Sequence, residues 1–135
     1  MSKVIKKRLL IVVGIIFLWW FFFFDLRVYQ LNNVLADNSE IDNYPYPFSV
    51  VSFEDGVATI SSPRSGKVSA VTVLRQLFPE LRNESESSSK MVEAQQTLAA
   101  TQSKVAELIK QQEDVNRVTW ELDEYWLSSH GIEVF

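Results

Sequence analysis

Few side chains in this sequence could form a catalytic or metal centre. The chain of 135 residues has one histidine, His130, and no cysteine. The absence of cysteine excludes thiol nucleophiles, zinc–thiolate sites and disulfide bonds. No second histidine or acid is spaced from His130 as metal ligands are. Because Gly131 follows directly, we expect His130 to cap the end of a short helix.

Two further chemical motifs are incomplete. The chain has many serines but lacks the nucleophile-elbow motif of the Ser-His-Asp hydrolases. Ser65-Gly66-Lys67 resembles part of a phosphate-binding loop, yet the GxxxxGK[ST] framework is absent. We therefore expect that the protein is not an enzyme and that it holds no metal or cofactor.

Aromatic residues near the C-terminus are better candidates for binding. Tyr125 and Trp126 follow the acids Glu121, Asp123 and Glu124, and Tyr and Trp concentrate binding energy in protein interfaces. Two adjacent aromatic side chains cannot both face inward on one short helix. The cluster is therefore either an interaction surface or one core aromatic residue beside solvated acids.

A second aromatic pair, Trp19 and Trp20, lies within the apolar segment Leu9–Phe24. Tryptophan in membrane proteins usually lies at the membrane–water interface, whereas this pair is nearer the middle of the segment. The pair either packs against another protein's transmembrane helix, or the span is shifted, or aromatic residues are simply tolerated at these positions. Gly14 is the only small residue of the segment, so it has no GxxxG dimerisation motif.

The segment Leu9–Phe24 contains no polar side chain, which predicts a transmembrane helix. It is about 24 Å long as a helix, and continuation to Leu31 would cover the ~30 Å hydrocarbon core. The positive-inside rule places the N-terminus in the cytoplasm, because four cations precede the segment: Lys3, Lys6, Lys7 and Arg8.

A cleavable signal peptide is the alternative, with Val34-Leu35-Ala36 as the processing site. We favour a retained anchor, because the apolar segment is bulky and ends about a dozen residues before Ala36. A stripe of one helical face continues beyond the segment, at Phe24, Val28, Leu31 and Leu35. We expect this stripe to dock on the outer domain or on lipid headgroups rather than to form a self-association seam.

Charge separates the two ends of the chain. From Asp25 onward there are 17 acids and nine Lys or Arg residues, a net charge of −8. An acidic domain of this kind argues against nucleic acid as a partner. The expected partners are the lipid bilayer and other membrane or envelope proteins, and the oligomeric state stays open. The expected location is a bacterial inner membrane, since small outer domains without disulfides are ordinary in bacteria.

The pattern predicts four parts: a basic tail (1–8), a transmembrane helix with its extension (9–31), a linker (32–47) and an outer domain (48–135). In the domain we expect a β-hairpin at Phe48–Ile60, turning at Asp55-Gly56. An extended stretch from Val68 to about Val73 and a helical turn follow, and then comes a long helix at Lys90–Gln112.

The last part of the domain is predicted as a strand, a short helix and a final strand. Val115–Leu122 alternates, with inward positions at Val118, Trp120 and Leu122. The short helix ends at Gly131, before a strand at Ile132–Phe135. The predicted fold class is α+β, a mostly antiparallel sheet with one long and one or two short helices.

A local resemblance adds one possibility. Residues 57–68, VATISSPRSGKV, resemble the first lipoyl half-motif of the membrane-fusion adaptors of secretion and efflux systems. Those adaptors resume with a second half-motif after a long helical hairpin, whereas this chain has a single long helix. The resemblance implies an accessory role beside a transporter.

These observations predict a membrane-anchored accessory or structural protein whose acidic outer domain binds other envelope proteins. The alternatives are a truncated adaptor-like component of a transport system and a small ligand-binding domain.

Overall fold

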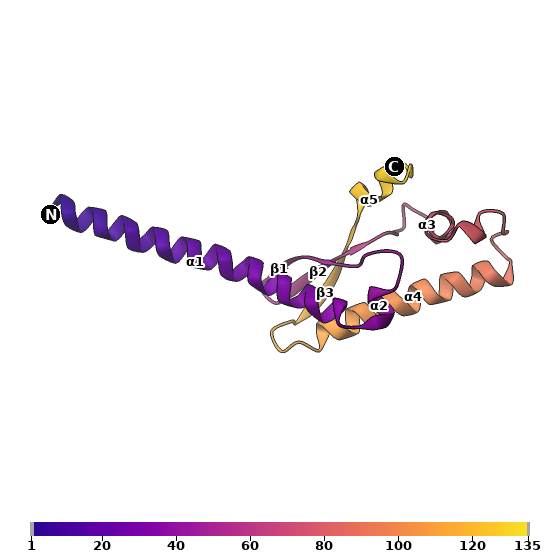
Figure 1. Ribbon diagram of the computed structural model, residues 1–135, viewed down its shortest axis with the longest axis horizontal. Helices are drawn as coiled ribbons and strands as arrows, with labels where there is room; N and C mark the ends of the chain where they lie inside the picture. Colours follow the sequence, from indigo (N-terminus) through magenta and orange to yellow (C-terminus); the bar gives the residue numbers. More distant parts are fainter. Residues whose placement is uncertain (1, 135) are drawn as a thin grey trace.

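The computed structural model describes residues 2–134, with only the backbone described at residues 22–25. A long helix projects from a small domain of mixed helix and sheet (Figure 1). In chain order the elements are α1 (Lys3–Ala36), α2 (Ser39–Asp42), β1 (Val50–Glu54), β2 (Val57–Ser62), α3 (Ala70–Leu77), the 3-10 helix η1 (Pro79–Leu81), α4 (Ser89–Lys110), β3 (Arg117–Leu122) and α5 (Glu124–Ser129). The prediction of a mixed domain behind an apolar N-terminal helix is confirmed.

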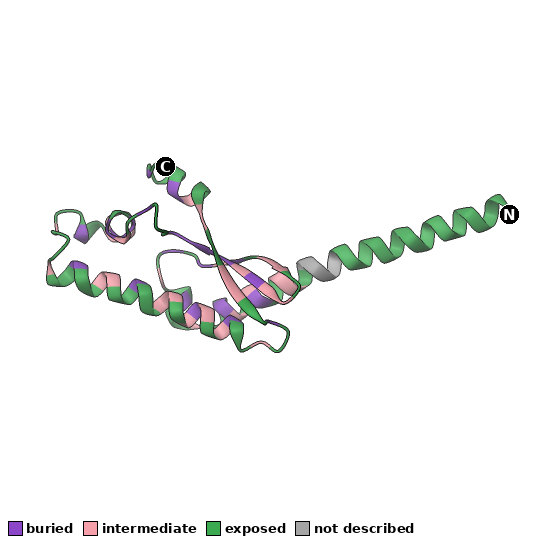
Figure 2. Ribbon diagram, turned by 180° about the vertical axis from the view of Figure 1, so that it is seen from behind, coloured by how far each residue is buried: buried purple, intermediate pink, exposed green. Residues whose placement is uncertain are grey.

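The two ends of α1 have opposite environments. The helix is long and apolar enough to cross a membrane, and its residues up to Phe21 are exposed (Figure 2). Leu31 and Leu35, near its other end, are 0% and 2% exposed, and Val28 packs against the same core. The predicted docking of the stripe on the domain is confirmed for these three residues, whereas the Phe24 side chain lies outside the described part.

The predicted hairpin is confirmed. Asp55 and Gly56 have φ angles of 49° and 78°, and two left-handed residues in succession are typical of the tight turn that joins twisted strands. The Gly56 carbonyl oxygen accepts hydrogen bonds from the backbone N–H groups of Asn116 (2.7 Å) and Arg117 (3.1 Å). The turn therefore also holds the start of β3.

The sheet is mixed, so the prediction of a mostly antiparallel sheet is wrong. The strand order is β1-β2-β3, with β1 antiparallel and β3 parallel to β2. The chain between β2 and β3 passes through α3, η1 and α4, and a long helical crossover of this kind returns the chain in the same direction. Trp120, predicted to face inward, is 41% exposed because it lines an open cleft between the sheet and helix α4.

The predicted extended stretch up to Val73 is also wrong, because this region begins helix α3. The Ser69 hydroxyl accepts a hydrogen bond from the Thr72 backbone N–H at 3.2 Å and caps the helix. Val71 and Leu74 then enter the main core, while Val73 joins a second cluster. Packing of these residues outweighs their local preference for strand.

Helix α4 confirms the predicted long helix, which the Ser88 side chain caps. It packs on α1, α2, α3 and β3. The predicted short helix is present as α5, and short helices α2 and α3 exceed the one or two expected. Residues 32–47, predicted as a linker, contain the end of α1, helix α2 and the fully buried Tyr46.

The predicted final strand does not form in residues 132–134, and Phe135 lies outside the described residues. Gly131 has a φ of 73°, and the Ile132 N–H turns back to donate to the Leu127 carbonyl at 2.9 Å. This left-handed end of α5 directs Ile132 into a small cluster with Leu127 and Val68.

Candidate functional site

The aromatic residues Tyr125 and Trp126, whose environments the sequence leaves open, face different surroundings on helix α5. Asp123 caps the helix by accepting a hydrogen bond from the Trp126 backbone N–H at 3.0 Å. Tyr125 is 85% exposed. Trp126 is half-buried: its ring meets the Tyr46 ring edge-on at 5.2 Å and stacks on the His130 ring at 4.0 Å. One residue therefore anchors α5 and the other faces solvent.

A buried tyrosine fixes this helix to the core. The Tyr46 hydroxyl donates to the Asp123 carboxylate at 2.8 Å. Burial raises the pKa of the Tyr46 phenol, so the group stays a neutral donor at physiological pH. Asp123 thus binds both the helix backbone and a core side chain, and α5 is held in one orientation.

Tyr125 lies at the rim of an open hollow of about 820 Å³. The hollow runs along α5 and the C-terminal segment, with Glu124, Glu133 and Val134 among its lining residues. We call Glu124, Tyr125, Glu133 and Val134 the α5 patch. It combines an exposed aromatic ring with two carboxylates, a combination suited to a partner surface that carries cations.

His130 caps the end of α5, as predicted. Its Nδ1 lies 2.7 Å from the Trp126 carbonyl oxygen and 3.2 Å from the Ser129 hydroxyl. Among the described residues, no group of three His, Asp or Glu side chains is placed to hold a metal ion.

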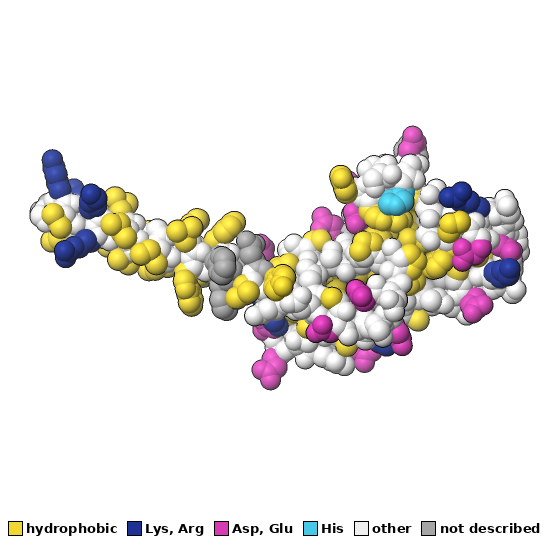
Figure 3. Space-filling view, viewed as in Figure 1, with side chains coloured by type: hydrophobic (Ala, Val, Ile, Leu, Met, Phe, Trp, Pro, Cys, Tyr) yellow, Lys and Arg dark blue, Asp and Glu magenta, His cyan; other side chains and the backbone are white. Residues whose placement is uncertain are grey.

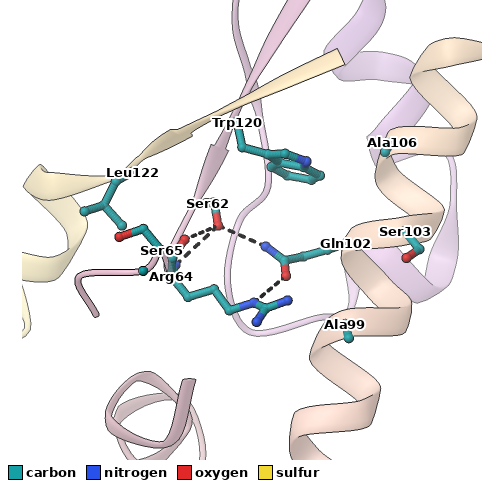
Figure 4. A pocket seen from close by; sticks show the side chains of 10 residues that line it. Ser62, Arg64, Ser65, Ala99, Gln102, Ser103, Ala106, Trp120 and Leu122 are labelled. Carbon is teal, nitrogen blue, oxygen red and sulfur yellow. Dashed lines mark hydrogen bonds between the residues drawn. The ribbon is translucent and has the colours of Figure 1, made fainter. Parts of the chain in front are cut away.

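A second hollow, a cleft of about 570 Å³, lies between the ends of β2 and β3 and helix α4 (Figure 4). Gln102 is held at both ends of its amide: Nε2 donates to the buried Ser62 hydroxyl at 2.9 Å, and Oε1 accepts from Arg64 Nε at 2.7 Å. The Trp120 ring lies above this amide. The polar groups that line the cleft are thus bonded to one another, because the Ser62 hydroxyl also donates to the Arg64 carbonyl oxygen at 3.0 Å.

Sequence reasoning missed this cleft. In the sequence, Ser62 and Arg64 stand out only as part of the segment that resembles the lipoyl half-motif, and Gln102 is a polar residue of the predicted long helix, 40 residues after Ser62. Of the residues that line the cleft, Trp120 and Leu122 are marked by the alternation of the predicted strand, as inward positions. Nothing in the spacing of these residues indicates that they meet.

The tryptophan pair lies on the apolar half of α1. Trp19 and Trp20 are 72% and 67% exposed, so the folded domain does not cover them. Their side chains are presented to whatever surrounds the helix.

An ion pair ties α1 to the distant loop after α4. Arg27 donates through Nε and Nη2 to the two carboxylate oxygens of Asp114, at 2.7 and 2.5 Å. The hydrogen bond from Arg27 lowers the pKa of the Asp114 carboxyl. This two-point contact fixes the domain against the helix just beyond the apolar segment.

Residues 57–68, which resemble the lipoyl half-motif, form β2 and a turn closed by a bridge between Ser65 and Val68. This strand is the middle strand of the mixed sheet. No protein-family model, curated protein or solved structure matches the chain.

Proposed function

We propose that this chain is a single-pass protein of a bacterial inner membrane whose outer domain binds another envelope protein through the α5 patch. The observation that carries the proposal is Tyr125, 85% exposed on a helix that Asp123, Tyr46 and Trp126 fix to the core. A rigidly held, exposed aromatic residue loses little entropy on binding, and such residues dominate interface energies.

The proposed topology follows from charge. Basic side chains gather at the far end of α1, whereas acidic side chains spread over the domain (Figure 3). The positive-inside rule puts that end in the cytoplasm and the domain outside. The buried end of α1 supports a retained anchor, since cleavage after Ala36 would remove Leu31 and Leu35 from the core.

A phosphatase reporter that is active only outside the cytoplasm should therefore be active when fused to the C-terminus. Replacing Lys3, Lys6, Lys7 and Arg8 with glutamate should lower that activity severalfold, because the orientation signal is lost. Mass spectrometry of the mature protein should find residues 1–36 still attached. A cytoplasmic C-terminus, or a mature chain that starts at Asp37, would contradict the topology.

Partner recovery tests the α5 patch. The tagged full-length protein, purified from gently solubilised membranes, should bring a stoichiometric envelope protein with it. Tyr125→Ala should weaken that complex about 30-fold, the effect of losing an interface residue worth about 2 kcal/mol. Val92→Ala is the matched control, since Val92 is 42% exposed on α4, away from the patch. Equal recovery with both variants, or recovery of the protein alone, would refute the proposed role.

A further inference from the structure

The outer edge of β3 carries backbone groups that the described part of the chain leaves unpaired. The N–H groups of Arg117 and Asp123 donate toward β2, to the carbonyl oxygens of Gly56 and Ser62. Residues of a parallel strand alternate in the side to which their N–H and C=O point. The backbone groups of Val118, Trp120 and Leu122 therefore face the open edge, and no fourth strand among residues 2–134 pairs with them.

The opposite edge of the sheet is protected. There the Asn32 side chain of α1 occupies both backbone groups of Val50, and the β1 register is irregular between Val50 and Ser52. Natural proteins protect edge strands in these ways because an open edge is a template for pairing with another strand. The β1 edge is therefore protected at Val50, whereas no side chain is bonded to the outward backbone groups of β3 in the described part of the chain.

The residues along β3 are complementary to a second copy of themselves. We propose that β3 pairs antiparallel with β3 of a second chain about a two-fold axis at Thr119. In this register Val118 lies opposite Trp120, and both have backbone groups that face outward, so each pair exchanges two hydrogen bonds. Arg117 lies opposite Glu121, and both are exposed.

Each feature of this register recurs twice in the dimer. Two Arg–Glu pairs lie at positions where opposing side chains approach most closely, and two Val–Trp pairs join an aromatic to a β-branched residue. Charge complementarity of this kind selects a second copy of the chain over an arbitrary strand. The product is a continuous six-stranded sheet.

The absence of native cysteine provides a clean test on the full-length protein in membranes. Thr119 would face its own copy across the axis at about 4.5 Å between Cα atoms, within the range of a disulfide. Thr119→Cys should form a disulfide-linked dimer at several times the yield of Val92→Cys, an exposed control position on α4. Equal yields would overturn the proposal.

Charge exchange tests the register in the same background. Arg117→Glu or Glu121→Arg should each lower the Thr119→Cys dimer yield by on the order of tenfold, since both cross-strand pairs become repulsive. Co-expression of the two variants should restore a mixed dimer. Unchanged yields would overturn the proposed pairing of β3 with β3. A mixed dimer no more abundant than the dimer of either variant alone would also overturn it, as would the binding of a different protein to the β3 edge.

This inference does not rest on the proposed function. Tyr125→Ala should leave the Thr119→Cys dimer intact, and the charge reversals should leave the α5 patch available. If the Thr119→Cys dimer fails to form, the pairing of β3 has failed. If Tyr125→Ala does not weaken partner recovery, the role of the α5 patch has failed.

Discussion

A chain lacking residues 1–36 is expected to be unfolded rather than to form an independent folded domain. Leu31 and Leu35 are buried in the core, and loss of each such side chain costs about 2–5 kcal/mol. The fragment also loses the contacts of Arg27 and Asn32 with the domain. Together these losses approach the free energy of unfolding of a typical domain, which is about 5–15 kcal/mol.

The control for this experiment keeps the end of α1 and removes the apolar segment. A fragment of residues 26–135 retains the buried leucines and should unfold cooperatively in circular dichroism on heating. A fragment of residues 37–135 should show no cooperative transition. A cooperative transition of the shorter fragment within a few degrees of the longer one would show that the end of α1 is dispensable.

What the sequence predicts well here is local. The stripe at Val28, Leu31 and Leu35 follows from helical spacing alone, and the hairpin follows from Asp55-Gly56, since the turn requires residues that accept positive φ. The cap of α4 and the end of α5 at Gly131 are likewise set by neighbours in sequence.

What the sequence does not predict depends on contacts between distant segments. The parallel pairing of β3 is decided by the helical crossover, which the alternation of Val115–Leu122 cannot show. Tyr46, 77 residues before Asp123, decides how α5 sits and hence that Trp126 turns inward while Tyr125 faces solvent. The sequence shows the cluster of acidic and aromatic residues that forms the candidate site, but it does not show which of Tyr125 and Trp126 faces solvent.

Asn32 is the clearest case of a residue whose role only the fold reveals. In sequence it is a polar residue at the start of a presumed linker. In the structure its Nδ2 donates to the Val50 carbonyl at 3.0 Å, and its Oδ1 accepts from the Val50 N–H at 2.7 Å. One amide side chain thereby supplies both bonds that a neighbouring strand would make to this residue of β1.

Asn32→Leu keeps the approximate size of the side chain and leaves both Val50 groups without partners. Each buried unsatisfied group costs about 1–3 kcal/mol, so we expect a loss of about 2–4 kcal/mol in the free energy of unfolding. At about 4–8 °C per kcal/mol for a domain of this size, Tm should fall by about 8–30 °C. Thermal denaturation of the full-length protein in detergent micelles, followed by near-ultraviolet circular dichroism, measures this shift.

Asn33→Leu is the matched control, because Asn33 is exposed one position along the same helix. Its Tm should stay close to that of the parent. Asn32→Leu should also promote aggregation, since it opens the β1 edge and gives the sheet two free edges in place of one. If the two variants melt within about 2 °C of each other, a shift worth at most about 0.5 kcal/mol, Asn32 does not protect this edge. The contrast between a closed β1 edge and an open β3 edge would then no longer favour β3 as the surface for a second copy.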